Sequence, residues 1–158
     1  MALIKLNNQS ISAITSAGLP SGTLVGYAYS NNVSTTYINS TSFTSTGLTV
    51  SYTPIDYANN KIYVSVSGHV TTDDNDLQRI RFKVGVTGDH TADLISSQEL
   101  GIDRSGGWSI KNVACVKEDT GFTANASATY TLYGNSTNST LDFRPQNTLT
   151  FTVMEIAG

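Results

Sequence analysis

The chain is poor in the residues that usually carry catalysis, redox chemistry or nucleic-acid binding. Its 158 residues include one cysteine, two histidines, three prolines and one tryptophan, and only 13% are charged. Cys115 can form no internal disulfide, and its apolar neighbours Ala114 and Val116 predict a partly buried, inert thiol. The formal net charge of −3 lacks the basic excess of a nucleic-acid-binding domain, so no nucleic acid is expected as a partner.

Long apolar runs are missing as well. No stretch approaches the roughly 18 apolar residues of a membrane span, and the apolar run near Met1 is too short for a signal peptide. We therefore expect no membrane partner and synthesis in a cytoplasm.

Motifs of the common enzyme classes are also missing. The chain has no G-x-S-x-G elbow, no P-loop, no H-E-x-x-H and no C-x-x-C. Asp89 or Asp93 acting with His90 is the catalytic combination left open, and a polysaccharide-cleaving enzyme would need two of Asp89, Asp93, Glu99 and Asp103 in one cleft. We expect no enzyme activity and no cofactor.

One acidic run is a candidate metal site. Asp73–Asp76 supplies three carboxylates and an amide, which are ligands that Ca²⁺ accepts, but the EF-hand spacing is absent. A solvated acidic turn is the simpler interpretation, and no metal is expected.

The residues that are abundant indicate an all-β fold. Threonine (22), serine (19) and asparagine (13) make up about a third of the chain and favour strands and turns. Apolar and polar residues alternate with period two in Lys61–Val70, Arg79–Val86 and Ala126–Gly134, and no segment has a helical period. Further strands are expected at Thr23–Ser30, Val33–Ile38, Leu48–Thr53, Leu149–Val153 and Trp108–Lys117, the last with a bulge at Asn112, whereas Gly88–Gly107 is expected to be an irregular loop. Together these patterns predict an antiparallel β-sandwich or jelly roll of about eight strands over residues 23–158.

Residues 1–22 differ from the rest and predict an extended N-terminal arm. Small and polar residues dominate there, and Leu19-Pro20-Ser21-Gly22 ends the segment with a turn signal. We expect the arm to dock on a neighbouring subunit or a host surface, with a disordered tail as the alternative. The apolar residues that would make the contact are Leu3, Ile4, Leu6, Ile11 and Ile14.

Two groups of strand residues are further candidates for interaction. Arg79, Arg81 and Lys83 form a basic row on the outward face of one strand, which serves solubility and edge protection or an ion pair with the Asp73–Asp76 run of another subunit. Tyr63 and Tyr133 suit a subunit interface, because tyrosine buries area and keeps a hydrogen bond.

Four segments carry a family resemblance. They are Leu6–Thr15, the stretch from Ser34–Tyr37 through Phe43–Pro54, Asn59–Val64, and the closing Thr152–Gly158 with its MEIAG ending, whereas residues from about 71 to 125 carry no resemblance. In these segments the chain resembles bacteriophage and cyanophage virion structural proteins of the tail-fibre and head-decoration (cement) type. The resemblance implies a jelly-roll domain, a homotrimer and a position on the outside of the virion, and it carries no catalytic residues.

Size favours one role within that family. The chain has no coiled-coil heptads and no repeated shaft motif, so a capsid decoration or cement protein is expected, made in the host cytoplasm and binding itself and the major capsid protein or another virion protein. The alternative is a tail-tip or short tail-fibre protein that recognises a host-surface glycan.

Overall fold

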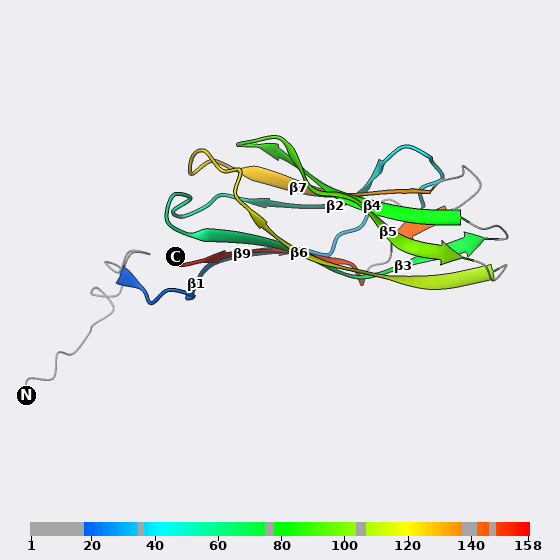
Figure 1. The fold of residues 1–158 in the computed structure, drawn as a ribbon, viewed down its shortest axis with the longest axis horizontal. Coiled ribbons are helices and arrows are strands. Elements are labelled where there is room, and N and C mark those ends of the chain that lie inside the picture. Colours follow the sequence, from blue (N-terminus) through cyan, green and yellow to red (C-terminus); the bar gives the residue numbers. More distant parts are fainter. Residues whose placement is uncertain (1–17, 35–36, 75–77, 104–106, 137–141, 146–147) are drawn as a thin grey trace, which may run out of the picture.

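The computed structural model describes residues 18–34, 37–74, 78–103, 107–136, 142–145 and 148–158. Two antiparallel sheets pack face to face in this part of the chain (Figure 1). Their strands are β1 (Leu24–Ser30), β2 (Thr44–Tyr52), β3 (Lys61–Asp74), β4 (Gln78–Gly88), β5 (Ala92–Asp103), β6 (Gly107–Asp119), β7 (Ala128–Ser136), β8 (Asp142–Pro145) and β9 (Thr150–Ile156). The expected all-β, antiparallel sandwich is confirmed.

The strand order is that of a jelly roll. Sheet A has the order β1-β9-β3-β6, and sheet B has the order β2-β7-β4-β5. β9 pairs with β3 from Lys61 to Ser67, and β8 pairs with β3 from Val70 to Asp73. β8 and β9 therefore act as one interrupted strand, which leaves eight strands in two four-stranded sheets.

Gly68 of β3 lies opposite the interruption between β8 and β9. Its φ is +133°, and a Cβ at this position would lie 2.5 Å from the carbonyl oxygen of Thr148 and 2.7 Å from the Cα of Leu149. Glycine is required because any side chain would meet backbone atoms that cannot give way. The close approach lets the chain cross over Gly68 into β9.

The core lies between the two sheets and follows the period-two pattern. From sheet A, the inward residues include Ile62, Val64 and Val66, all at most 2% exposed. From sheet B, Ile80, Phe82, Val84 and Val86 face them, together with Tyr130 and Leu132 of β7. The rings of Tyr130 and Phe151 meet across the interface with centroids 6.3 Å apart. Burial of these apolar faces supplies the main stabilisation of the sandwich.

Three sequence-based predictions differ from the structure. Most of Gly88–Gly107, expected to be irregular, is strand β5; its ladder with β4 shifts register three times, which hides the alternation. The bulge expected at Asn112 is absent, because the β3–β6 register runs unbroken from Ile62↔Asp119 to Asp74↔Gly107. Val33–Ile38 is not a strand in its described residues: Val33 packs on the core and Ile38 makes a single bridge.

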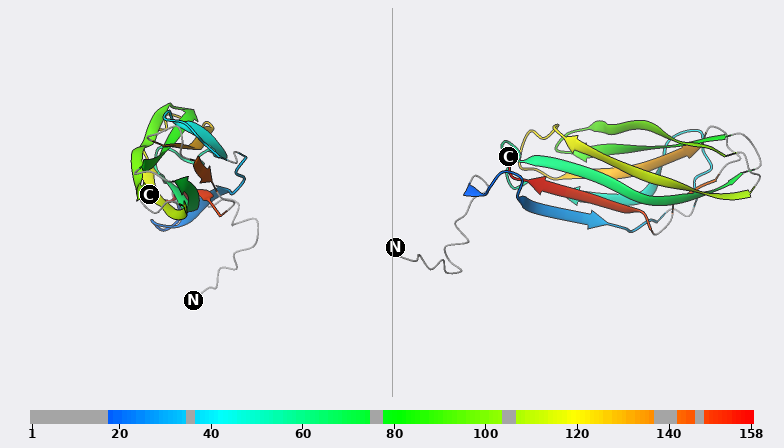
Figure 2. Two further views of the ribbon diagram at one scale, coloured as in Figure 1. Left: turned by 90° about the vertical axis from the view of Figure 1, so that its right-hand side faces the viewer. Right: turned by 60° about the horizontal axis from the view of Figure 1, so that its bottom comes forward.

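Most of the predicted arm lies outside the described residues, including Leu3, Ile4, Leu6, Ile11 and Ile14. Its last part, from Gly18, is described. The amide of Gly22 donates to the carbonyl of Ala157 at 2.9 Å, and the amide of Ala157 donates to the carbonyl of Thr23 at 2.8 Å. The chain therefore enters β1 tied to the end of β9, at one end of the elongated sandwich (Figure 2).

Candidate functional site

The outer face of sheet A carries exposed aromatic residues. Tyr27 of β1, Met154 of β9 and Tyr63 of β3 form one row across the sheet, and Tyr29 lies in the next row. Tyr27 and Tyr29 are 54% and 62% exposed, with ring centroids 5.9 Å apart. We call this surface the tyrosine face; it also includes the exposed Leu24 and Val116. Exposed aromatic clusters of this kind are typical of protein interfaces.

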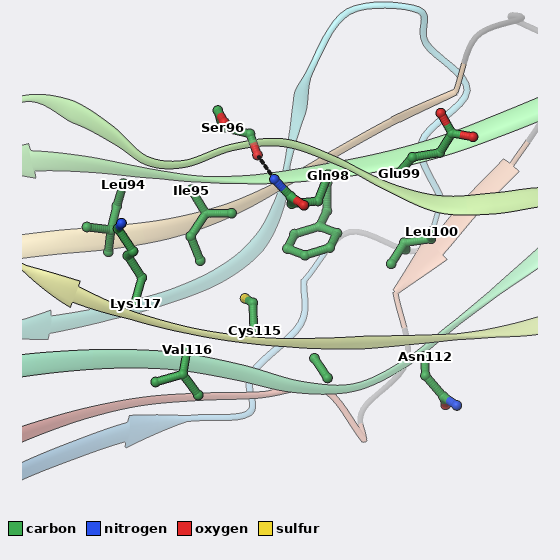
Figure 3. A pocket seen from close by; sticks show the side chains of 12 residues that line it. Leu94, Ile95, Ser96, Gln98, Glu99, Leu100, Asn112, Cys115, Val116 and Lys117 are labelled. Carbon is green, nitrogen blue, oxygen red and sulfur yellow. Dashed lines mark hydrogen bonds between the residues drawn. The ribbon is translucent and has the colours of Figure 1, made fainter.

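An open groove separates the edge strands on one side of the sandwich. β5 is the edge of sheet B and β6 the edge of sheet A, and no ladder joins them within the described residues. The groove has a volume of about 560 Å³. Phe82 and Ile95 of the core line it, together with the half-buried Leu94, Leu100 and Cys115 (Figure 3). The rim is polar and includes Ser96, Gln98, Glu99, Asn112 and Lys117.

Cys115 faces this groove from β6. The side chain is half-buried, and burial raises the pKa of its thiol, although a hydrogen bond involving the backbone of Val66 lowers it in part. A raised pKa keeps the thiol protonated at neutral pH and slows its reactions. The structure therefore agrees with the partly buried thiol predicted from the sequence.

The outer face of sheet B brings two of the predicted interaction residues together. The Lys83 ammonium lies 5.3 Å from the ring centroid of Tyr133 and 5.4 Å from that of Phe43. It also forms an ion pair with Asp93 at 2.9 Å. The charge of Lys83 is thus paired within its own chain, and both rings add a cation–π contact.

Beside this pair lies a shallow hollow of about 340 Å³. The hollow exists because Gly85 has no side chain; a Cβ there would lie 3.0 Å from Cε2 of Tyr133. Lys83, Asp93 and Tyr133 line the hollow with the hydroxyl-bearing Thr87 and Thr91. An aromatic ring among polar groups is the arrangement expected of a site for a polar, ring-shaped ligand.

The structure describes the other two residues of the predicted basic row, Arg79 and Arg81, in less detail than Lys83. Arg81 is half-buried on β4 and pairs in register with Glu99 of β5. Arg79 lies on the same strand opposite Ile102, but its side chain is outside the described ones, as are those of Asp73 and Asp74. The candidate Ca²⁺ ligands of Asp73–Asp76 are therefore not placed by the structure.

A buried carboxylate at one end of the sandwich joins the sheets. Glu155 of β9 is 0% exposed, and its Oε2 accepts hydrogen bonds from the Tyr52 hydroxyl at 2.6 Å and the Ile55 amide at 2.8 Å. Its Oε1 accepts from the Asn60 side chain at 2.6 Å and the Asp56 amide at 2.9 Å. Burial alone raises the pKa of Glu155, but these four hydrogen bonds outweigh it and the net pKa is lowered.

A second buried carboxylate, Asp119, lies on the other side of β3 and also accepts a hydrogen bond from a tyrosine of sheet B. In sheet A, Ile62 pairs with Glu155 on one side and with Asp119 on the other. Asp119 accepts a hydrogen bond of 2.8 Å from the hydroxyl of Tyr130 in sheet B. The pKa of Tyr130 is raised far above its usual range, mainly because its hydroxyl is buried and also because of this hydrogen bond and the charge of Asp119. The end of the sandwich is thus closed by two tyrosine–carboxylate pairs.

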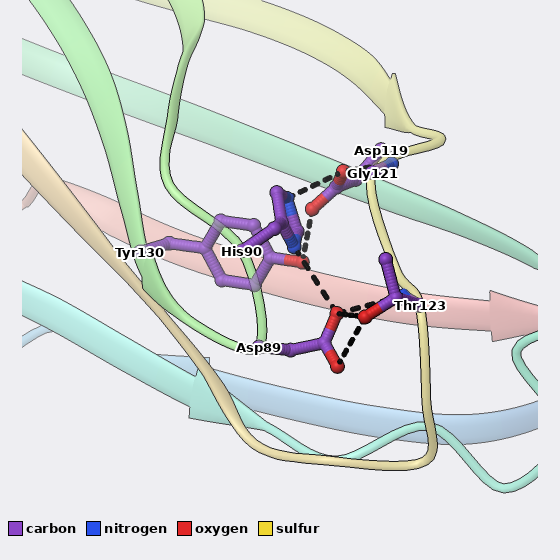
Figure 4. A network of polar contacts seen from close by, with 6 residues as sticks. All are labelled: Asp89, His90, Asp119, Gly121, Thr123 and Tyr130. Atoms are coloured by element: carbon purple, nitrogen blue, oxygen red, sulfur yellow. Dashed lines mark hydrogen bonds and ion pairs between the residues drawn. The ribbon is translucent and has the colours of Figure 1, made fainter.

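His90 lies between two carboxylates at this end (Figure 4). Its Nε2 is 3.1 Å from Asp119 Oδ1, and its Nδ1 is 3.5 Å from Asp89 Oδ2. Both nitrogens are buried, and neither makes a hydrogen bond to a described group. Phe122 packs edge-on against the ring at 5.2 Å.

The arrangement around His90 suits a structural role. The Asp89 and Asp119 side chains are both 2% exposed, and Asp89 also accepts a hydrogen bond of 2.8 Å from the Thr123 amide. The described contacts of Asp93 are with Lys83, so the combination of Asp93 and His90 left open by the sequence is not assembled. These contacts hold the loop after β4 against the loop after β6.

The chain was compared with protein-family models and with curated proteins. No protein-family model matches it, and no curated protein matches it. In the described residues, no group of three or more His, Cys, Asp or Glu side chains could hold a metal ion. None of the described segments is a helix long and apolar enough to cross a membrane.

Sequence reasoning missed several residues that matter at these surfaces. Leu94, Gly85, Asp119 and Glu155 are not among the site residues that the sequence predicts, whereas Tyr27 and Tyr29 belong to the tyrosines that the sequence offers for a subunit interface. Strand parity could have placed the two carboxylates, because Glu155 shares the parity of Phe151 and Val153, and Asp119 that of Val113. The groove had no such signal, since it depends on how the edges of two sheets meet.

Proposed function

We propose that this chain is a non-enzymatic structural protein of a bacteriophage virion, most specifically a trimeric decoration or cement protein on the outer surface of the head. The observation that carries the proposal is the tyrosine face: Leu24, Tyr27, Tyr29 and Val116 are each more than half exposed on a jelly roll that has little surface charge. Such a surface is stable in water when it is covered by another protein surface.

The polar chemistry of the chain also fits assembly better than catalysis. The buried titratable groups hold the sandwich end together: Glu155 has four hydrogen-bond donors, and Asp119 binds Tyr130 and the amide of Gly121. A general acid or base needs access to substrate, which carboxylates with 0–2% exposure lack. The family resemblance of the N- and C-terminal segments supports the same role.

The test is the position of the protein in an intact particle. Electron microscopy of the phage that encodes this chain should show jelly-roll density of this strand order, in groups of three, on the outside of the head and in contact with the major capsid protein. Absence of the chain from purified particles would contradict the proposal, and density at the tail tip would favour the second candidate.

The second candidate is a receptor-binding protein for a host-surface glycan. The hollow beside Gly85 favours it, because Tyr133 offers a ring for stacking while Asp93, 55% exposed, and two threonines offer hydrogen bonds. A host glycan array with the intact protein tests this role. Tyr133→Ala should reduce binding by roughly tenfold or more, whereas Tyr29→Ala on the opposite sheet should not; no glycan binding would exclude this candidate.

A further inference from the structure

We propose that the N-terminal segment of one copy, residues 1–17, occupies the open groove between β5 and β6 of the next copy. This inference rests on the self-assembly proposed above and names the contact that joins the copies. The groove, rather than the tyrosine face, is the surface that an extended segment fits.

In the groove, apolar residues next to the core are only partly covered. Phe82 and Ile95 at its base are 3% and 8% exposed, whereas Leu94, Leu100 and Cys115 around them are only half-buried. Its volume of about 560 Å³ lies within the range of about 300–1,000 Å³ for built binding sites. Apolar side chains inserted there would extend the core of the sandwich and remove this surface from water.

The walls of the groove also suit an extended backbone. β5 and β6 are both edge strands, of 12 and 13 residues, and edge strands present backbone groups that can pair with an added strand. Addition of a strand to a sheet edge supplies affinity through the main chain and specificity through alternate side chains. A short peptide segment therefore fits this site better than a globular surface does.

The N-terminal segment has the matching chemistry. It carries Leu3, Ile4, Leu6, Ile11 and Ile14, and Lys5 is its only charged side chain. In extended form, 17 residues span up to roughly 58 Å. The segment is thus apolar enough to enter the groove and long enough to reach a neighbouring molecule.

The position of the groove is compatible with a contact between successive copies. The segment leads into β1, at one edge of sheet A, whereas β6 forms the opposite edge of that sheet. A contact between opposite edges is head-to-tail, and head-to-tail contacts generate closed rings when the rotation closes. Three copies related in this way would each donate one segment and receive one.

The reactivity of the Cys115 thiol can be used to measure this contact. Cys115 is the only cysteine of the chain and lies in the groove, so its labelling rate measures how often the groove is open. In the full-length protein, the double variant Ile4→Asp and Leu6→Asp should label about tenfold faster or more, as expected if the groove is covered nine-tenths of the time. The control Asn7→Asp and Asn8→Asp adds the same charge at polar positions and should label as the unaltered protein does. Circular dichroism checks that all variants are folded.

A cross-link identifies which copy donates the segment. Leu6→Cys, treated with an added oxidant, should give covalent dimers and trimers on a non-reducing gel through the pair with Cys115. A monomer with an internal disulfide would overturn the proposal in favour of the chain's own segment. Equal labelling of the Asp variants would overturn it as well; if sedimentation still gives a trimer, the proposed function survives that failure, whereas a monomer would remove both.

Discussion

Tyr52 and Glu155 join the two sheets through a hydrogen bond of 2.6 Å between a hydroxyl and a fully buried carboxylate. Tyr52 is the last residue of β2 in sheet B, and Glu155 lies near the end of β9 in sheet A. The same carboxylate receives the amides of Ile55 and Asp56, so one side chain fixes the sheets and the connection that leads to β3. Gly26 makes room for the pair, since a Cβ there would overlap the Tyr52 hydroxyl.

Replacement of Glu155 should be among the more destabilising single changes. Glu155→Gln replaces one carboxylate oxygen with an NH2 group that would face hydrogen-bond donors. The expected loss is about 2–4 kcal/mol in the free energy of unfolding. Tyr52→Phe, which removes one donor, should lose about 1–2 kcal/mol. Urea unfolding measures both, with Tyr29→Phe on the exposed surface as the control. A loss equal to that of the control would show that the carboxylate is not structural.

Acid should weaken the fold through the same group. Because the pKa of Glu155 is lowered in the folded state from an ordinary value of 4.5, the unfolded chain takes up the proton first as the pH falls. Its contribution is therefore complete above about pH 4.5 and declines as the pH falls toward the folded pKa. The stability difference between the unaltered protein and Glu155→Gln should shrink below pH 4.5 in urea titrations; a constant difference would contradict this linkage.

Gly121 should be intolerant of even a methyl group. A Cβ there would lie 2.4 Å from Cδ2 and 2.6 Å from Nε2 of His90, so the ring would have to leave Asp119. Gly121→Ala should lower the free energy of unfolding by about 1–3 kcal/mol. Adding His90→Ala vacates the space, so the double variant should lose less than the sum of the two single losses. Additive losses would mean that the two residues do not interact.

Gly68 tests the interrupted strand. Gly68→Ala combines a left-handed φ with overlap on the backbone of Thr148 and Leu149, and the expected loss is roughly 2–5 kcal/mol. Ser67→Ala, next to it on the exposed face, is the control and should change thermal unfolding little. If Gly68→Ala is as stable as that control, the chain does not cross β3 as closely as described.

The parts of the fold that the sequence predicts are those with one buried and one polar face. β3, β4 and β7 alternate cleanly, as Ile62, Val64 and Val66 illustrate, and their positions were predicted within a few residues. β5 was missed because Ile95 and Leu100 are out of phase with period two and the strand is bulged against β4. An edge strand has fewer residues on the core, so its pattern is weaker.

The sequence does not predict which strands become neighbours or in which register they pair. Lys83 and Tyr133 were both predicted as interaction residues, but their contact with each other and with Phe43 requires the β4–β7 register and the course of the chain before β2. The polar contacts near His90 likewise join the loop after β4 to the end of β6 and the loop that follows it, which are far apart in the sequence. These are non-local contacts, which no local periodicity encodes.

We propose that the exposed surfaces of this jelly roll are covered by other copies of the chain. Sedimentation equilibrium of the full-length protein at micromolar concentration tests it most directly. The predicted result is a single species of three times the chain mass of 16.8 kDa. A species of 16.8 kDa that does not associate at that concentration would contradict the account.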